Sequence, residues 1–147
     1  MGMTVKISAR PENIHIVASG DFSLDEAKRT FLEVLDAVQR HGTSKVLFDG
    51  RDINGEPLLI ERFYYGQFAA DHVRYLKEHG WRGGEPQFAY VLEEPVLDWL
   101  RFGEMVARNR GLNTRAFDNP DDAVEWLALG LDEIESTDEP AETLADN

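Results

Sequence analysis

The chain has 147 residues, of which 42% are hydrophobic and 10% aromatic, so it is long enough for one domain with an ordinary hydrophobic core. The absence of cysteine excludes a disulfide framework, a thiol nucleophile and a cysteine-ligated zinc site. No apolar run reaches the roughly 20 residues that span a bilayer, and no segment resembles a secretory signal peptide, so we expect a cytoplasmic protein.

The net charge of −13 is unevenly distributed along the sequence. Residues 131–147 hold seven of the 28 acidic residues and no base, which leaves 21 acids against 15 bases, or about −6, for the rest of the chain. An acidic body repels phosphate, which argues against nucleic acid and anionic membranes as partners. Because residues 131–147 also have little apolar surface to bury, we expect a single domain at 1–130 and a disordered acidic tail. The tail is interpreted as solubilising, with partner binding as the alternative.

Residues 1–42 predict a hairpin followed by a helix. Apolar and polar residues alternate on both sides of a turn at 10–13, which is typical of two paired strands. Ser23 and Glu26 form a capping box, the pattern that begins a helix, and Gly42 is its expected end. The apolar residues on one face of this helix are Ala27, Phe31, Val34, Leu35 and Val38.

The rest of the domain alternates short strands with helices. Strands are expected at 46–49, 88–92 and 113–117, and helices at about 57–78, at 96–110 and from 120 onward. A polar loop at 50–56 precedes the second helix, and Asn119 and Pro120 suit the cap and first residue of the last one. The order β-β-α-β-α-β-α-β-α predicts an α/β fold with a mostly parallel sheet, right-handed crossover helices and one antiparallel N-terminal hairpin strand.

The helix at 57–78 has more apolar surface than one packed face requires. One wide face should belong to the core, and its residues are Leu58, Leu59, Phe63, Tyr65, Gly66, Ala69, Ala70, Val73 and Leu76. Tyr64, Phe68 and Tyr75 form a second, separate aromatic stripe. This stripe can pack against another element of the domain, form a homodimer interface or line a ligand groove, and the sequence leaves these three alternatives open.

Carboxylates follow two of the predicted strands. Asp49 ends the strand at 46–49 and Asp52 follows it, and Glu93 and Glu94 follow the strand at 88–92. Open α/β sheets bind ligands at the carboxyl ends of their strands, so these residues are candidates for partner or ligand binding, or for catalysis by a small enzyme. Because no catalytic motif accompanies them, a non-enzymatic binding module is the better interpretation.

Two patterns superficially resemble metal sites. One matches an EF-hand calcium loop, except that Gly50 stands at the first position and has no carboxylate. Its matching residues are Asp52, Asn54, Gly55 and Glu61. In the other, His72 and His79 lie seven residues apart on the second helix and lack a third zinc ligand. We therefore expect neither a metal nor a cofactor.

Two segments, KVLFDGRDING at 45–55 and FDNPDDAVEWL at 117–127, add detail to this order of elements. The first is a buried strand that ends in a polar turn, and the second is a strand, a capped turn and a final helix. With them, residues 3–128 resemble the STAS fold of the bacterial anti-sigma-factor antagonists, and more closely its SpoIIAA-like branch.

The resemblance implies binding to a protein partner. Anti-sigma-factor antagonists dock a kinase and are switched by phosphorylation of a Ser or Thr at the turn before the second helix. From Asp49 to Tyr75 this sequence has neither residue, so we expect no Ser/Thr phospho-switch at that turn. The SpoIIAA-like branch is also similar in fold to CRAL-TRIO lipid-carrying domains, which suggests an apolar or lipid-like ligand by analogy.

Overall fold

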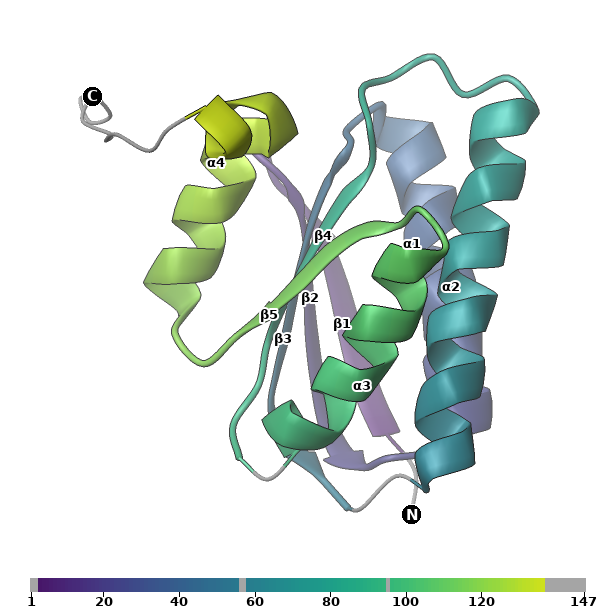
Figure 1. The fold of residues 1–147 in the computed structure, drawn as a ribbon, viewed down its shortest axis with the longest axis vertical. Coiled ribbons are helices and arrows are strands. Elements are labelled where there is room, and N and C mark those ends of the chain that lie inside the picture. The colour runs from purple at the N-terminus through teal and green to yellow at the C-terminus, as the bar shows by residue number, and fades with distance from the viewer. Residues whose placement is uncertain (1–2, 56–57, 95, 137–147) are drawn as a thin grey trace.

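The computed structural model describes residues 3–55, 58–94 and 96–136, and in these residues a five-stranded sheet has helices on both faces (Figure 1). The strands are β1 (Met3–Ala9), β2 (Ile14–Asp21), β3 (Lys45–Asn54), β4 (Gln87–Val91) and β5 (Asn113–Phe117). The helices are α1 (Leu24–His41), α2 (Leu59–Glu78), α3 (Val96–Asn109) and α4 (Pro120–Ser136). The predicted order of elements is confirmed.

The strands lie side by side in chain order, β1-β2-β3-β4-β5. β1 pairs antiparallel with β2, and each later strand is parallel to the one before it. Because the chain moves across the sheet from β2 to β5 in one direction, crossovers of one hand place their helices on one face. Figure 1 shows α1, α2 and α3 together on that face and α4 on the other. The mostly parallel sheet with one antiparallel N-terminal strand is as predicted.

The larger core lies between the sheet and the three crossover helices. At its centre Phe31 of α1 meets Phe88 of β4, with ring centroids 5.3 Å apart. α2 contributes the small side chains of Ala69 and Ala70, which let this helix lie close to its neighbours. The predicted apolar face of α1 is buried throughout. Ser23 caps α1 as predicted by accepting a hydrogen bond from the Glu26 amide at 3.3 Å, but the Glu26 carboxylate accepts from the Met3 amide of β1, so the other half of the predicted capping box is not formed.

A smaller core lies between the opposite face of the sheet and α4. Its buried residues are Leu47, Ala89, Val91, Ala123, Trp126 and Leu127. Two polar side chains from the starts of β3 and β4 hold the helix in place. Gln87 Nε2 donates to the carbonyl of Trp126 at 3.1 Å, and Lys45 Nζ donates to the carbonyl of Leu127. Because Gln87 is buried, its amide needs such a partner.

β3 is longer than the sequence predicts. It continues from Asp49 to Asn54, so most of the predicted polar loop at 50–56 is strand. The pairing with β2 continues past an irregularity between Val17 and Ser19, where β3 holds one extra residue. Parallel pairing with β2 therefore outweighed the local turn pattern. Strand formation depends on contacts with the neighbouring strand more than on the intrinsic β-propensity of the residues.

The ends of α2 and α4 also differ from the prediction. Pro57, predicted to lie in the first turn of the second helix, is outside the described residues, and α2 begins at Leu59. α4 continues to Ser136, past the predicted start of the tail at 131, since neither proline nor a second glycine follows Gly130 before that point. Residues 137–147 are outside the described residues, so the disordered tail stays a prediction.

Candidate functional site

The first turn of α2 begins just beyond the edge at which the parallel strands end. Leu58 is the residue before the helix, with an extended backbone at φ −65° and ψ 154°. Its side chain has no oxygen with which to cap the helix. The Glu61 carboxylate instead accepts a hydrogen bond from the Leu58 amide at 2.8 Å. This contact ties the entering chain to the helix and orients the residues on either side of it.

Three large apolar side chains at this end of α2 face solvent, and we call them the α2 apolar patch. The exposed fractions are 63% for Leu58, 54% for Ile60 and 46% for Tyr64. Ile60 and Tyr64 lie four residues apart and therefore on one helix face. Single exposed apolar residues are ordinary, whereas a group of them at one end of a helix marks a candidate binding surface.

Leu58 was expected in the core, and that prediction is wrong. The helix begins after Leu58, so the helical period does not set the direction of its side chain. The other residues of the predicted core face that the structure describes as buried are Gly66, Ala69, Ala70, Val73 and Leu76. Ile60 is part of the patch although the sequence analysis did not single it out. Its spacing from Tyr64 was the signal that could have found it.

The aromatic stripe predicted on α2 does not form one continuous surface. Tyr64 belongs to the α2 apolar patch. Phe68 is half-buried against the larger core, and the ammonium group of Lys28 lies 5.3 Å from its ring centroid. Tyr75 is exposed near the other end of the helix, where its ring stacks on His79 with centroids 3.8 Å apart. Phe68 therefore packs within its own domain, and the stripe divides into two exposed ends.

The two patterns that resembled metal sites are occupied by other interactions. Asp52 and Asn54 lie in β3, so no calcium loop is formed there. His72 and His79 each use Nδ1 in a hydrogen bond to the carbonyl four residues earlier on α2, at 3.0 and 2.8 Å. Across the described ranges, no group of three or more His, Asp or Glu side chains is placed to hold a metal ion.

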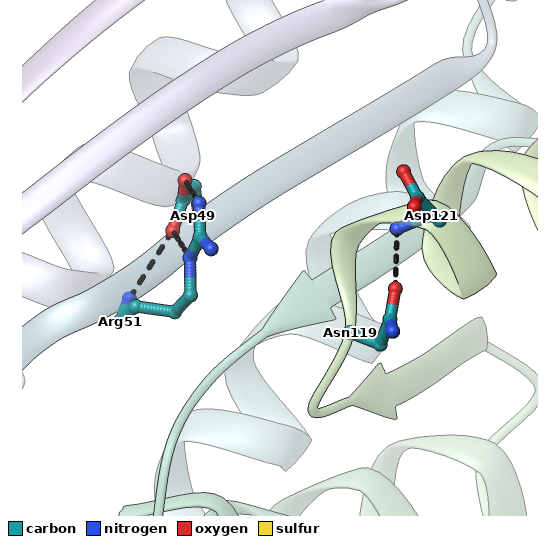
Figure 2. Close-up of polar contacts among 4 residues, drawn as sticks. All are labelled: Asp49, Arg51, Asn119 and Asp121. Atoms are coloured by element: carbon teal, nitrogen blue, oxygen red, sulfur yellow. Dashed lines mark hydrogen bonds and ion pairs between the residues drawn. The ribbon is translucent and has the colours of Figure 1, made fainter.

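One of the candidate carboxylates, Asp49, is paired with a residue that the sequence analysis missed, Arg51. Asp49 binds its guanidinium through two contacts, 2.8 Å from Nη2 and 3.0 Å from Nε (Figure 2). The hydrogen bond to Asp49 is the largest cause of a raised pKa for Arg51, and the charges of Glu93 and Asp52 add to it. Alternate residues of a strand share a face, so the spacing of Asp49 and Arg51 already indicated this pair.

The same contact sets the protonation state of Asp49. The hydrogen bond from Arg51 lowers the pKa of Asp49, although partial burial opposes the shift. A general acid or base that works near neutral pH needs a pKa close to that pH, whereas Asp49 is moved away from it. Asp52, Glu93 and Glu94 are exposed. Asp49 lines a cavity of about 50 Å³ whose walls include none of the other three, so the carboxylates do not converge in one pocket, which weighs against the small-enzyme alternative.

Replacing Asp49 with asparagine is expected to lower stability slightly at neutral pH, by no more than about 1 kcal/mol because the arginine is solvent-exposed. A depressed pKa stabilises the folded state above the unfolded value near 4, and this contribution disappears as pH falls through the folded value. The difference between wild type and variant should therefore be present at about pH 6 and shrink as the pH falls below about 4. Urea unfolding across this range measures it, and a difference independent of pH would contradict the assignment.

The start of α4 lies at the same edge of the sheet. Asn119 Oδ1 accepts hydrogen bonds from the amides of Asp121 at 2.7 Å and Asp122 at 3.3 Å (Figure 2 shows the first). The predicted cap at Asn119 is thereby confirmed. Because the cap and two acidic residues already occupy this helix end, its amides are not available to an anionic ligand.

Two small cavities beside the larger core share Tyr65 and Tyr90 in their walls. Their volumes are about 30 and 50 Å³. Each has room for a few waters, whereas pockets that enclose drug-sized ligands measure roughly 300–1,000 Å³. Between the cavities the two tyrosine hydroxyls are hydrogen-bonded at 2.7 Å. Neither cavity is large enough to enclose a lipid-like ligand.

Comparisons with known proteins agree with the architecture. A model of the SpoIIAA-like family matches residues 13–128. An anti-sigma factor antagonist from Mycobacterium paratuberculosis is similar in structure, with a TM-score of 0.51 and 14% identity over 84% of this chain and 92% of that one. An uncharacterized protein of the DUF3478 family with a SpoIIAA-like fold, from Shewanella loihica PV-4, has a TM-score of 0.47 and 16% identity over 86% and 94%. No curated protein sequence matches. Among the described residues, no helix is both long and apolar enough to cross a bilayer.

Proposed function

The chain belongs to the SpoIIAA-like family, and we propose that it is a non-enzymatic regulatory module that docks a protein partner through the α2 apolar patch. The observation that carries the proposal is the group of three exposed apolar side chains at the start of α2, namely Leu58, Ile60 and Tyr64. Tyrosine and large apolar residues are the side chains that bury well at protein interfaces. The structural neighbour named as an anti-sigma factor antagonist is, by that name, a protein that acts on another protein, which supports the same class of function.

A protein partner is favoured over an apolar ligand by the volumes of the two cavities beside Tyr65 and Tyr90. Volumes of about 30 and 50 Å³ are several times too small for a lipid chain. The patch, by contrast, is exposed and lies at a helix end, which suits contact with another protein surface.

The proposed docking does not include a Ser/Thr switch at the turn before α2. The segment from Asp49 to Tyr75 contains no serine or threonine. At the start of this segment, Asp49 and Arg51 form an ion pair with each other. A charge change there would have to come from another group or from the partner.

The test uses two variants of the full chain, Ile60→Glu and Tyr64→Glu, each of which places a charge in the patch. Both side chains are half exposed, so the melting temperature should stay within about 3 °C of wild type. Partners are captured from extracts of the source organism, identified by quantitative mass spectrometry, purified and titrated against each variant. Binding should weaken by at least about tenfold, because a buried unpaired charge at an interface is costly.

The matched control is Leu32→Glu, which adds the same charge at a leucine that is 43% exposed on α1. It should retain the partner with unchanged affinity. The proposal fails if every captured protein binds the two patch variants as tightly as wild type. It also fails if native mass spectrometry finds a small molecule carried by the purified chain and lost from the patch variants. The same spectra report the oligomeric state and so test the homodimer alternative.

A further inference from the structure

A shallow groove of about 580 Å³ lies between α3 and β5, next to the cavity of about 30 Å³, with which it shares Glu104, Arg115 and Ala116 as lining residues. Its charged walls are formed by Arg101, Arg108 and Arg115, with Met105 between them. Residues 101–115 contain four arginines and a single acid, Glu104, in a chain whose net charge is −13. The groove is therefore a local basic surface on an acidic protein.

The acid inside the groove is already engaged. One oxygen of Glu104 accepts a hydrogen bond from Arg108 Nη1 at 3.3 Å, and the other accepts one from the Ala116 amide at 3.2 Å. The second contact covers an amide on the open edge of β5, which opposes the addition of a further strand there. Neither Arg101 nor Arg115 forms an ion pair with the residues that the structure describes. A ligand of the groove would therefore be bound by these side chains.

Ring and cation contacts connect the groove to the α2 apolar patch. The Tyr64 ring lies edge-to-face on Phe63, with centroids 5.6 Å apart. The guanidinium of Arg110 lies 5.9 Å from the centroid of the same Phe63 ring. Arg110 directly follows Asn109, the last residue of α3 and a wall of the groove. One partner could thus contact both surfaces without crossing the sheet.

We propose that the groove between α3 and β5 binds an acidic segment of the protein partner that docks on the α2 apolar patch, an inference that rests on the proposed function. Guanidinium groups bind carboxylates through paired hydrogen bonds, so two arginines without ion-pair partners favour a peptide rich in Asp and Glu. Met105 is half exposed and offers apolar contact to a side chain between the acids. The net charge of −13 repels a long polyanion, which extends over the acidic parts of the surface. A short acidic segment lies within the groove, where the nearby arginines have the largest electrostatic effect on it.

The probe is a fluorescein-labelled peptide, GDEELDEELG, titrated against the full chain by fluorescence anisotropy. The acidic peptide should bind, its affinity should fall as salt rises from about 50 to about 200 mM, and its neutral analogue GNQQLNQQLG should not bind. The double variant Arg101→Gln, Arg115→Gln should weaken binding by about tenfold or more. The control variant Arg40→Gln, Arg74→Gln removes two arginines that pair with Asp36 and Asp71 on other helices, and it should bind the peptide as wild type does.

Three results would overturn the assignment. The first is equal peptide affinity in the two double variants. The second is tighter binding of a short single-stranded oligonucleotide than of the acidic peptide, which would point to nucleic acid. The third is a clear gain in affinity when residues 137–147 are deleted, which would assign the groove to the chain's own acidic segment.

Failure of this inference and failure of the proposed function give different results. If Ile60→Glu abolishes partner binding while the variant lacking Arg101 and Arg115 still binds the partner, docking through the patch is supported and the role of the groove is rejected. The opposite result is that peptide binding depends on the two arginines while Ile60→Glu and Tyr64→Glu leave every partner bound. The groove is then supported as an acidic-peptide site, and docking through the patch is rejected.

Discussion

Replacing Phe31 with alanine is expected to lower the free energy of unfolding by about 3–5 kcal/mol, which is a large part of the 5–15 kcal/mol typical of a domain. Phe31 is fully buried and its ring contacts those of Phe88 and Tyr65, with centroid distances of 5.3 and 6.1 Å. The three rings come from α1, β4 and α2, so truncating Phe31 leaves a cavity where these elements meet. Urea denaturation followed by circular dichroism measures the loss.

The matched control is the next residue along the helix. Leu32 is 43% exposed and packs little, so Leu32→Ala should cost well under about 1 kcal/mol. Similar losses for the two variants would mean that the core is not centred on Phe31. If Phe31→Ala does not fold at all, Phe31→Leu gives a smaller loss of the same origin and keeps the comparison measurable.

The second large effect is expected at alkaline pH, where the buried pair of Tyr65 and Tyr90 should destabilise the fold. Burial raises the pKa of Tyr65 to about 12, with the hydrogen bond from Tyr90 acting in the opposite direction. Burial also raises the pKa of Tyr90 well above its ordinary value. Both residues are half-buried, and their hydroxyls are hydrogen-bonded to each other at 2.7 Å.

The direction follows from linkage. Below about pH 10 both tyrosines are neutral in the folded and the unfolded chain, so stability is complete. Between about pH 10 and 12 the unfolded chain ionises its tyrosines while the folded chain does not, and stability falls. The shift of Tyr65 alone corresponds to a loss of up to about 3 kcal/mol, at 1.36 kcal/mol per pKa unit. Urea midpoints measured at intervals from pH 8 to about pH 11.5 should show the decline.

The double variant Tyr65→Phe, Tyr90→Phe isolates this effect from the other titrating groups. Removing both hydroxyls should change stability little at pH 8, because no partner is left unsatisfied, and should make the alkaline decline shallower. Tyr90→Phe alone should cost about 1–3 kcal/mol at pH 8, since it leaves the Tyr65 hydroxyl buried without its partner. An alkaline decline as steep in the double variant as in wild type would show that other groups cause it.

Much of the fold followed from local patterns. Apolar spacing, the Ser23 cap and the Asn119 cap are properties of short segments, and the structure forms them as predicted. The parallel sheet also followed, because strands that alternate with helices have few other ways to connect. The extent of β3 did not follow, because its last residues look like a turn in isolation and become strand by pairing with β2.

The candidate site was predictable only in part. The sequence indicated Tyr64 and the carboxylates Asp49, Asp52 and Glu93; of these carboxylates, Asp49 pairs with Arg51, and the charges of the other two act on that arginine. The sequence grouped Phe68 and Tyr75 with Tyr64 because the helical period predicts the direction in which each side chain points. The period cannot show which other parts of the domain cover each face of the helix. Phe68 is covered because the domain packs over it, whereas Tyr75 stays open at the far end of the helix.

By itself the sequence determined the fold class, the order of the elements, the buried face of α1 and the lack of a serine or threonine at the turn just before α2, because each depends on residue type and on spacing along the chain. Only the tertiary structure decided which apolar residues of α2 stay exposed, that Tyr65 and Tyr90 pair within the core, and that arginines of α3 and β5 share one groove. The Tyr65–Tyr90 pair, for example, joins residues 25 positions apart on different elements. The physical reason is that burial and electrostatic contact depend on how the helices pack on the sheet, and periodicity along one segment carries no information about that packing.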